Sequence, residues 1–235
     1  MSEVKFKPLD LNLEIHNLIF KKNPFQNVNL ENYEEISQNF IDTTKEIYQE
    51  NNNLILKGKK PIFFDEIINK ILIEKPDKVL FSCFYNQQIF YAAKLSEELK
   101  KLDITTALGG PIVHEKYSTF FDKLVYSKED FSTLLNKEIE TDFEIIPDFS
   151  KLELDKYFSA NNKLVYPVRF SRGCYYGKCT FCTHHKNNTY LVKKLETLKK
   201  ELEGKKFVYF IDDMISPAQL VKISEITKEK NIKFY

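Results

Sequence analysis

Three cysteines lie within nine positions of one another in the second half of the chain. Cys174, Cys179 and Cys182 belong to the run SRGCYYGKCTFC, residues 171–182, which follows an apolar segment typical of a strand. Three thiolates on one loop can hold three irons of a four-iron cluster and leave the remaining iron open to an exogenous ligand. The spacing therefore predicts a [4Fe–4S] site with one open coordination position.

A structural zinc site is the alternative interpretation of the same cysteines. His184 or His185, two or three residues beyond Cys182, would then complete a Cys3His ligand set. Zinc-binding cysteines usually lie on turns of small independent modules, whereas these cysteines follow a strand in a repeating strand–helix pattern. We therefore expect a cluster and retain a zinc-binding interaction module without catalysis as the second hypothesis.

The remaining cysteine, Cys83, lies inside an apolar strand pattern, where a free thiol behaves as a small hydrophobic group. The other three are too closely spaced for an ordinary disulfide framework and suit a reducing compartment. Residues 1–10 contain no apolar leader, and no later stretch reaches the roughly 18 apolar residues of a membrane span. We therefore expect a cytoplasmic protein.

The charges of the chain are almost balanced. Lys and Arg number 35 against 34 Asp and Glu, which gives a formal net charge of +1. No strong overall field attracts nucleic acid or an anionic membrane, so the composition implies neither as a partner.

The cysteines must be positioned by strands and helices on both sides of them. In the first half, the patterns predict a strand at 4–12 and helices at 13–20, 30–50 and 61–74. A strand at 78–84, a helix at 88–101 and a strand at 104–108 form the clearest α/β unit, with a further short strand at 124–126. This order predicts a parallel sheet whose carboxyl edge carries Ser82, Gly109 and Gly110.

Repeated strand–helix units also follow a polar segment with Pro147. Strands are predicted at 164–170, 207–211 and 232–235, and helices at 190–203 and 218–230, with the cysteine loop at 171–186. We therefore predict an α/β protein with a Rossmann-like parallel sheet in residues 1–145, a linker at 146–163 and the first βα units of a TIM-type barrel at 164–235. A complete barrel of this kind has roughly 250 residues, so the chain looks cut off inside its second domain.

The cysteine loop resembles the CxxxCxxC signature of the radical S-adenosylmethionine (radical SAM) superfamily. Phe181 stands in the aromatic position before the last cysteine, although four residues here separate Cys174 from Cys179. The turn 109–111 (Gly-Gly-Pro) and the segment 147–149 (Pro-Asp-Phe) precede the loop in the order seen in the group with an N-terminal cobalamin-binding domain. These matches span most of the chain.

This resemblance implies an enzyme that cleaves S-adenosylmethionine reductively to a 5′-deoxyadenosyl radical, for methylation or rearrangement of an unknown small-molecule or peptide substrate. It implies an electron donor such as flavodoxin or ferredoxin. Phe181 would lie near the adenine, and Asp212 and Asp213 would hold the methionine amino group, since carboxylates accept charge-assisted hydrogen bonds from an ammonium. A solvated turn or a helix cap is the alternative for these two aspartates.

The same resemblance makes cobalamin a candidate cofactor of the first domain. Ser82, Gly109 and Gly110 match positions that line the corrin in that group. A Gly-Gly pair after a strand is equally typical of a tight turn, and no Asp-x-His-x-x-Gly ligand motif is present. A truncated relative that binds a cluster but lacks the barrel needed to enclose a radical is a further alternative.

Overall fold

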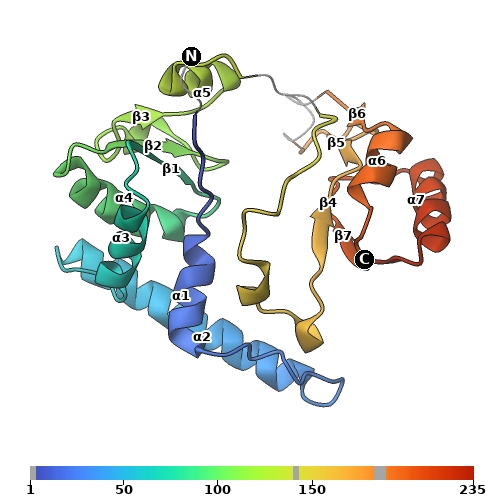
Figure 1. The fold of residues 1–235 in the computed structure, drawn as a ribbon, viewed down its shortest axis with the longest axis horizontal. Helices are drawn as coiled ribbons and strands as arrows, with labels where there is room; N and C mark the ends of the chain where they lie inside the picture. Colours follow the sequence, from blue (N-terminus) through green and yellow to red (C-terminus); the bar gives the residue numbers. More distant parts are fainter. Residues whose placement is uncertain (1–3, 140–142, 183–188) are drawn as a thin grey trace. The chain divides into compact units, whose positions relative to one another are not determined.

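The computed structural model divides into two compact units. Its described residues are 4–139, 143–182 and 189–235 (Figure 1). Unit 1 comprises Met1–Glu140 with Lys151–Lys156, and unit 2 comprises Thr141–Ser150 with Tyr157–Tyr235. None of the helices in the described ranges combines the length and apolar composition that crossing a bilayer demands.

In its described residues, unit 1 has a three-stranded parallel sheet and five α-helices. The helices are α1 (Leu11–Phe20), α2 (Tyr33–Leu56), α3 (Phe64–Ile73), α4 (Asn86–Lys100) and α5 (Lys128–Leu135). The strands are β1 (Lys78–Ser82), β2 (Thr105–Gly109) and β3 (Lys123–Leu124), paired in parallel in the order β1-β2-β3. Two short 3-10 helices are η1 (Glu115–Tyr117) and η2 (Leu154–Lys156). The predicted strand–helix–strand unit is thus present as β1, α4 and β2.

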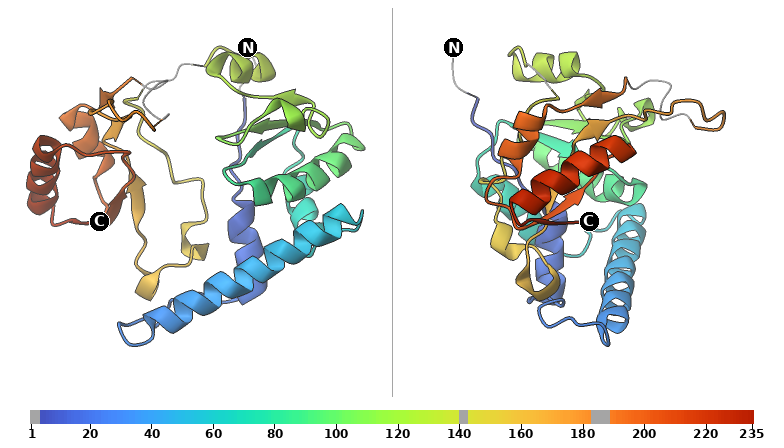
Figure 2. Two further views of the ribbon diagram at one scale, coloured as in Figure 1. Left: turned by 180° about the vertical axis from the view of Figure 1, so that it is seen from behind. Right: turned by 90° about the vertical axis from the view of Figure 1, so that its right-hand side faces the viewer.

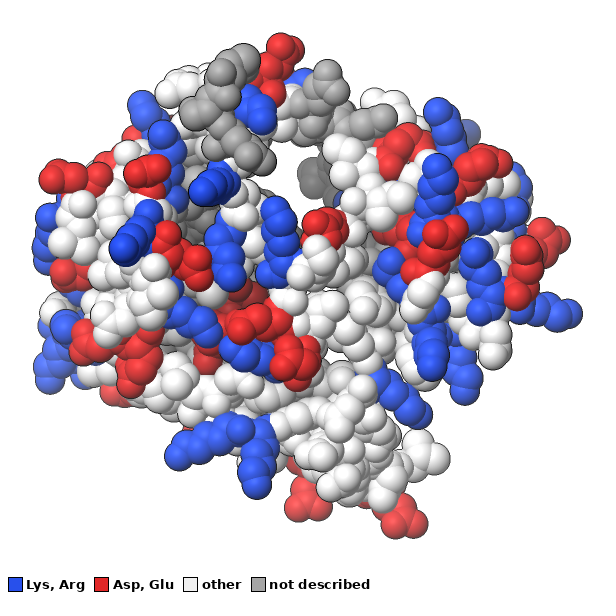
Figure 3. Space-filling view, in the orientation of Figure 1, with Lys and Arg blue, Asp and Glu red and all other residues white. Residues whose placement is uncertain are grey.

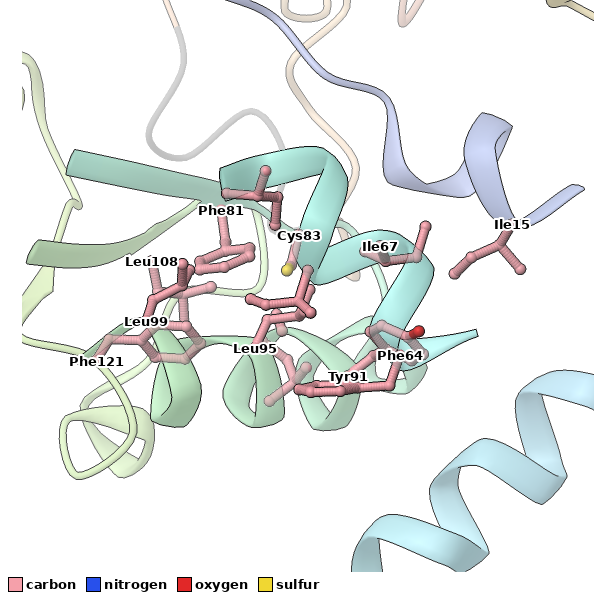
Figure 4. Close-up of a cluster of buried hydrophobic side chains, with 14 residues drawn as sticks. Ile15, Phe64, Ile67, Phe81, Cys83, Tyr91, Leu95, Leu99, Leu108 and Phe121 are labelled. Carbon is pink, nitrogen blue, oxygen red and sulfur yellow. The ribbon is translucent and has the colours of Figure 1, made fainter. Parts of the chain in front are cut away.

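The core of unit 1 lies where α3 and α4 pack against the sheet (Figure 4). Leu95 and Leu99 on α4 and Leu108 on β2 are fully buried. The Phe81 and Phe121 rings lie 5.8 Å apart between centroids beside them. The apolar stripe of α4 is therefore covered by the sheet, as its helical periodicity predicts.

The predicted strand at residues 4–12 is wrong. Residues 4–10 carry no strand, and α1 begins at Leu11. The Asp10 side chain accepts a hydrogen bond from the Leu13 backbone N–H at 3.1 Å and caps this helix, as its position before the apolar run predicts. The alternation before the cap does not produce a strand, because a strand also requires a neighbouring edge with which to pair.

Unit 2 contains a second parallel sheet and a small antiparallel pair (Figure 2). Its strands are β4 (Tyr166–Val168), β5 (Ser171–Arg172), β6 (Leu191–Val192), β7 (Phe207–Phe210) and β8 (Lys233–Phe234). Its helices are α6 (Leu195–Glu201), α7 (Pro217–Glu229) and the 3-10 helix η3 (Ala160–Asn162). The parallel sheet has the order β4-β7-β8, and β5 pairs antiparallel with β6. Mixed α/β structure with small parallel sheets is therefore confirmed for the chain.

The helices α6 and α7 cover one face of the β4-β7-β8 sheet. Leu198 and Leu202 at the end of α6 and Ile223 on α7 are fully buried against Val208 of β7. The helix predicted at 190–203 begins later, because Leu191 and Val192 pair with β5 and Lys193 N–H donates to the Phe170 carbonyl at 2.8 Å. Tertiary strand pairing thus takes precedence over helical periodicity in this segment.

Basic and acidic side chains alternate over the face of the molecule shown in Figure 3. Neither sign forms a continuous field there, in keeping with the near-equal totals in the sequence.

Candidate functional site

The cysteine loop begins at the carboxyl end of β4 in unit 2. β4 and β7 are parallel neighbours, with Val168 opposite Phe210, so the segments that follow them meet at one edge of the sheet. The segment after β4 carries the three cysteines, and the segment after β7 carries Asp212 and Asp213. The structure therefore brings the predicted cluster ligands and the two predicted aspartates to the same edge.

Asp212 fastens the first residues of the cysteine loop. Its carboxylate accepts hydrogen bonds from the backbone N–H groups of Phe170, at 3.1 Å, and of Ser171. It also accepts the Ser171 hydroxyl proton at 2.7 Å. Because Ser171 is completely buried, these bonds satisfy polar groups that water does not reach. Asp212 thus stabilises the start of the cysteine loop. The predicted role of binding the methionine amino group did not include this contact.

Asp213 makes a second connection between the two segments. Its carboxylate accepts the Gly173 backbone N–H at 2.9 Å. Gly173 has φ +83°, a backbone conformation that glycine adopts without strain, and it directly precedes Cys174. The two aspartates therefore set the path by which the chain enters the cysteine loop.

The Asp212 contacts predict a measurable loss of stability on substitution. Asp212→Ala leaves the Phe170 and Ser171 donors without their acceptor, so we expect unit 2 to lose about 2–4 kcal/mol of unfolding free energy. Asp212→Asn keeps one acceptor oxygen and should lose less than the alanine variant. Hydrogen exchange of unit 2 amides in increasing urea measures both effects. A loss below about 0.5 kcal/mol for Asp212→Ala would show that solvent replaces these bonds.

The three loop cysteines are partly buried and none forms a disulfide. The Cys182 N–H donates to the Cys179 carbonyl at 3.3 Å, which closes a turn between these two ligands. Cys174 Sγ lies 3.8 Å from the Met214 Sδ. Phe181 is 87% exposed, so its ring is available for stacking against a planar ligand. The loop therefore presents three partly exposed thiols and three exposed aromatic side chains, of which Phe181 is the most exposed.

The arrangement of the thiols bears on which metal the loop could hold. Among residues 4–139, 143–182 and 189–235, no three His, Cys, Asp or Glu side chains form a group that could hold a single metal ion. His184 and His185, the proposed fourth zinc ligands, lie outside the described residues. The donor set of three free thiols nevertheless fits a cluster, whose three thiolates bind different irons and do not converge on one ion.

Cys83 is buried and does not belong to the cysteine loop. Its burial was predicted from the apolar strand pattern around it. It is only 4% exposed and belongs to the unit 1 core, and burial raises the pKa of its thiol to about 11. A thiol that stays protonated and covered is a poor nucleophile.

Thiol labelling of the folded, metal-free protein should therefore distinguish the four cysteines. At pH 8 we expect Ellman's reagent to modify Cys174, Cys179 and Cys182 quickly, and Cys83 only after addition of denaturant. Absorbance of the released thiolate, with mass spectrometry of the labelled peptides, measures this. Rapid labelling of Cys83 would contradict its place in the core.

Ser82, Gly109 and Gly110 lie together at the carboxyl edge of the unit 1 sheet. Ser82 stands opposite Gly109 in the β1–β2 register, as predicted. Gly110 has φ +90°, and a Cβ added there would lie 2.5 Å from the Cys83 carbonyl oxygen. The chain's own backbone thus occupies the space beside Gly110 and explains the glycine without a ligand. Cobalamin binding stays a prediction from the resemblance and has no part in the function proposed below.

A buried ion pair in unit 2 was missed by sequence analysis. Lys193 Nζ lies 2.5 Å from Glu201 Oε2, and the two side chains are 3% and 1% exposed. Lys193 follows β6 and Glu201 ends α6, so their separation of eight residues matches no helical pairing rule. Nothing in the sequence pattern indicates this pair, because it forms only where the β5–β6 pair meets the helix.

Comparison with known proteins adds one likeness. A curated protein described as enterotoxin type D, from Staphylococcus aureus, is 25% identical over 156 residues, covering 60% of this chain and 58% of its own length. This chain therefore spans little more than half of that relative. The likeness is too low to define a family and does not support an iron–sulfur function. No protein-family model and no solved structure matches the chain.

Proposed function

We propose that the chain binds a [4Fe–4S] cluster through Cys174, Cys179 and Cys182 and acts in radical chemistry with S-adenosylmethionine. The observation that supports this most is the position of three free, accessible thiols on one loop at the carboxyl end of a parallel strand. Thiolates on a single loop that leave one iron open are the ligand set such chemistry requires.

The contacts of the loop support the same proposal. Asp212 and Asp213 hold the backbone of Ser171 and Gly173, so the chain enters the cysteine loop on a defined path. Ligands held by hydrogen bonds of this kind are better ordered for a metal centre than ligands on an untethered loop. Phe181 remains exposed for stacking with an adenine.

The bound cluster would supply one electron for cleavage of the S-adenosylmethionine sulfonium, which yields a 5′-deoxyadenosyl radical. The chain's own contribution is to hold the thiolates and orient the loop. The same proposal includes two statements about the fold. Unit 1 is a Rossmann-like domain, and the β4-β7-β8 sheet is part of a TIM-type barrel. Barrels of this type hold their substrates at the carboxyl ends of the strands, which is the edge that carries the cysteine loop here.

Zinc binding makes a different structural demand. All ligands of a structural zinc ion converge on one point, and the three thiols form no such group in the described part of the chain. His184 and His185, the fourth ligands of the Cys3His alternative, lie outside the described residues, so metal analysis distinguishes the two hypotheses.

Anaerobic reconstitution with ferrous iron and sulfide tests the proposal. We expect a brown protein with about four irons and sulfides per chain and absorbance near ~400 nm. Stoichiometric zinc with no colour would favour the interaction module instead. A folded protein that takes up neither iron nor sulfide would refute the proposed cluster.

The cluster-loaded protein can then be tested for cleavage of S-adenosylmethionine. With dithionite as reductant, we expect 5′-deoxyadenosine, detected by liquid chromatography and mass spectrometry. A loaded protein that produces none would match a cluster-binding relative without catalytic activity.

A further inference from the structure

Unit 2 contains a pocket of about 810 Å³ whose lining includes none of the three loop cysteines, although Arg172 at the start of the cysteine loop belongs to it. It lies between the segment 143–149, the β5–β6 pair, and residues of β4, α6 and the segment after β7. A volume of this size is in the range of small-molecule sites. The pocket thus adjoins the start of the cysteine loop but contains none of the proposed cluster ligands.

Arg169 in the lining of this pocket has a nitrogen without a partner among the described residues. The Arg169 Nε is buried and has no hydrogen-bond partner among the described residues. No ion pair to Arg169 is present in the same ranges. Arg169 as a whole is partly exposed, but a buried N–H of a guanidinium normally finds an acceptor, because an unsatisfied buried polar group is unfavourable. Arg169 therefore indicates a place for an anionic group.

A buried acceptor lines the same pocket. Glu201 is 1% exposed, and its Oε2 binds Lys193 while its Oε1 has no partner in the described part of the chain. A carboxylate oxygen in this position requires an N–H or O–H donor. The pocket therefore presents one buried guanidinium N–H and one buried carboxylate oxygen that have no partner among the described residues.

The remaining lining is largely apolar. It includes Ile145, Pro147, Phe149, Pro167, Leu191 and Ile211. Charged side chains also line it: three are cationic (Arg169, Arg172 and Lys193) and two are acidic (Glu144 and Glu201). Among the described residues of the lining, one positive charge is therefore in excess. A monoanion with an apolar body matches this lining better than a dianion such as phosphate.

From these contacts we propose that the pocket binds an N-acylated apolar amino acid. Its carboxylate pairs with Arg169, its amide N–H donates to Glu201 Oε1, and its side chain lies against the apolar wall. A planar carboxylate suits this role, because a guanidinium donates two parallel N–H bonds to it. Binding at this pocket requires no iron, so it can be tested on metal-free protein.

Titration calorimetry with N-acetyl-L-leucine tests this assignment. We expect this acid to bind, and its uncharged amide, N-acetyl-L-leucinamide, to bind much more weakly. The acid 4-methylpentanoate, which has the same apolar body but no N–H, should bind more weakly by several-fold. No binding at millimolar concentration, or equal binding of acid and amide, would overturn the proposal. If 4-methylpentanoate bound as tightly as N-acetyl-L-leucine, the proposed hydrogen bond from the amide N–H to Glu201 would be wrong.

Variants of Arg169 give the decisive comparison. Arg169→Gln should weaken N-acetyl-L-leucine binding roughly 10- to 100-fold, the effect of losing a charged hydrogen bond. Arg169→Lys keeps the charge and should retain part of the affinity, which separates lost recognition from a failure to fold. Lys178→Gln makes the same charge change outside the pocket and should bind like the unchanged protein. Unaltered affinity in Arg169→Gln, with the melting temperature preserved, would also overturn the assignment.

Discussion

Replacement of Cys179 by alanine is expected to reduce iron binding from about four irons per chain to less than about one. Cys179 is the middle ligand of the loop, so its loss leaves one iron of the cluster with only water or buffer as a ligand. Two thiolates on one loop do not retain a four-iron cluster through anaerobic desalting. Iron and sulfide analysis, with the visible spectrum near ~400 nm, measures the result.

Cys83→Ala is the matched control, since it also removes one of the four cysteines. Cys83 lies in the unit 1 core, so this variant should keep its full iron content while losing a little stability. A full complement of iron in Cys179→Ala would show that the ligand assignment is wrong. Equal iron loss in both variants would indicate nonspecific binding to thiols.

Replacement of Lys193 by methionine is expected to have the largest effect on stability. Glu201 is almost completely buried and its carboxylate pairs with Lys193 Nζ at 2.5 Å. Removal of the ammonium leaves a buried negative charge without its partner, which should lower the unfolding free energy of unit 2 by about 3–5 kcal/mol. Urea unfolding followed by hydrogen exchange of unit 2 peptides checks this value.

The double variant Lys193→Met with Glu201→Leu serves as the control for that prediction. Replacement of both charges by apolar groups of similar volume is often neutral or stabilising, so we expect most of the lost free energy to return. A single variant that loses less than about 1 kcal/mol would mean that water reaches Glu201. In that case Glu201 Oε1 would need no donor from a ligand.

Much of the fold could be predicted from local patterns. Helical periodicity and the Pro217 start predicted α7, and the apolar run at 78–84 predicted β1. These predictions succeeded because each segment has a period and end signals that agree with its burial in the structure.

The errors fall where a segment needs a distant partner. Residues 4–10 have strand-like alternation and no strand to pair with, whereas Leu191 and Val192 have helical spacing but pair with β5. Strand pairing joins segments that are far apart in sequence. The periodicity within one segment therefore does not predict whether that segment has a partner strand.

The candidate site shows the same division. The sequence alone is enough to place three thiols on one loop after a strand and to assign Cys83 to the core, because both depend on residue type and near spacing. Only the tertiary structure shows that Asp212 holds Ser171, that Lys193 meets Glu201 and that Arg169 lies unpaired in a pocket. These contacts depend on parallel pairing and helix packing, which join residues by their position in space and leave no periodic pattern along the chain.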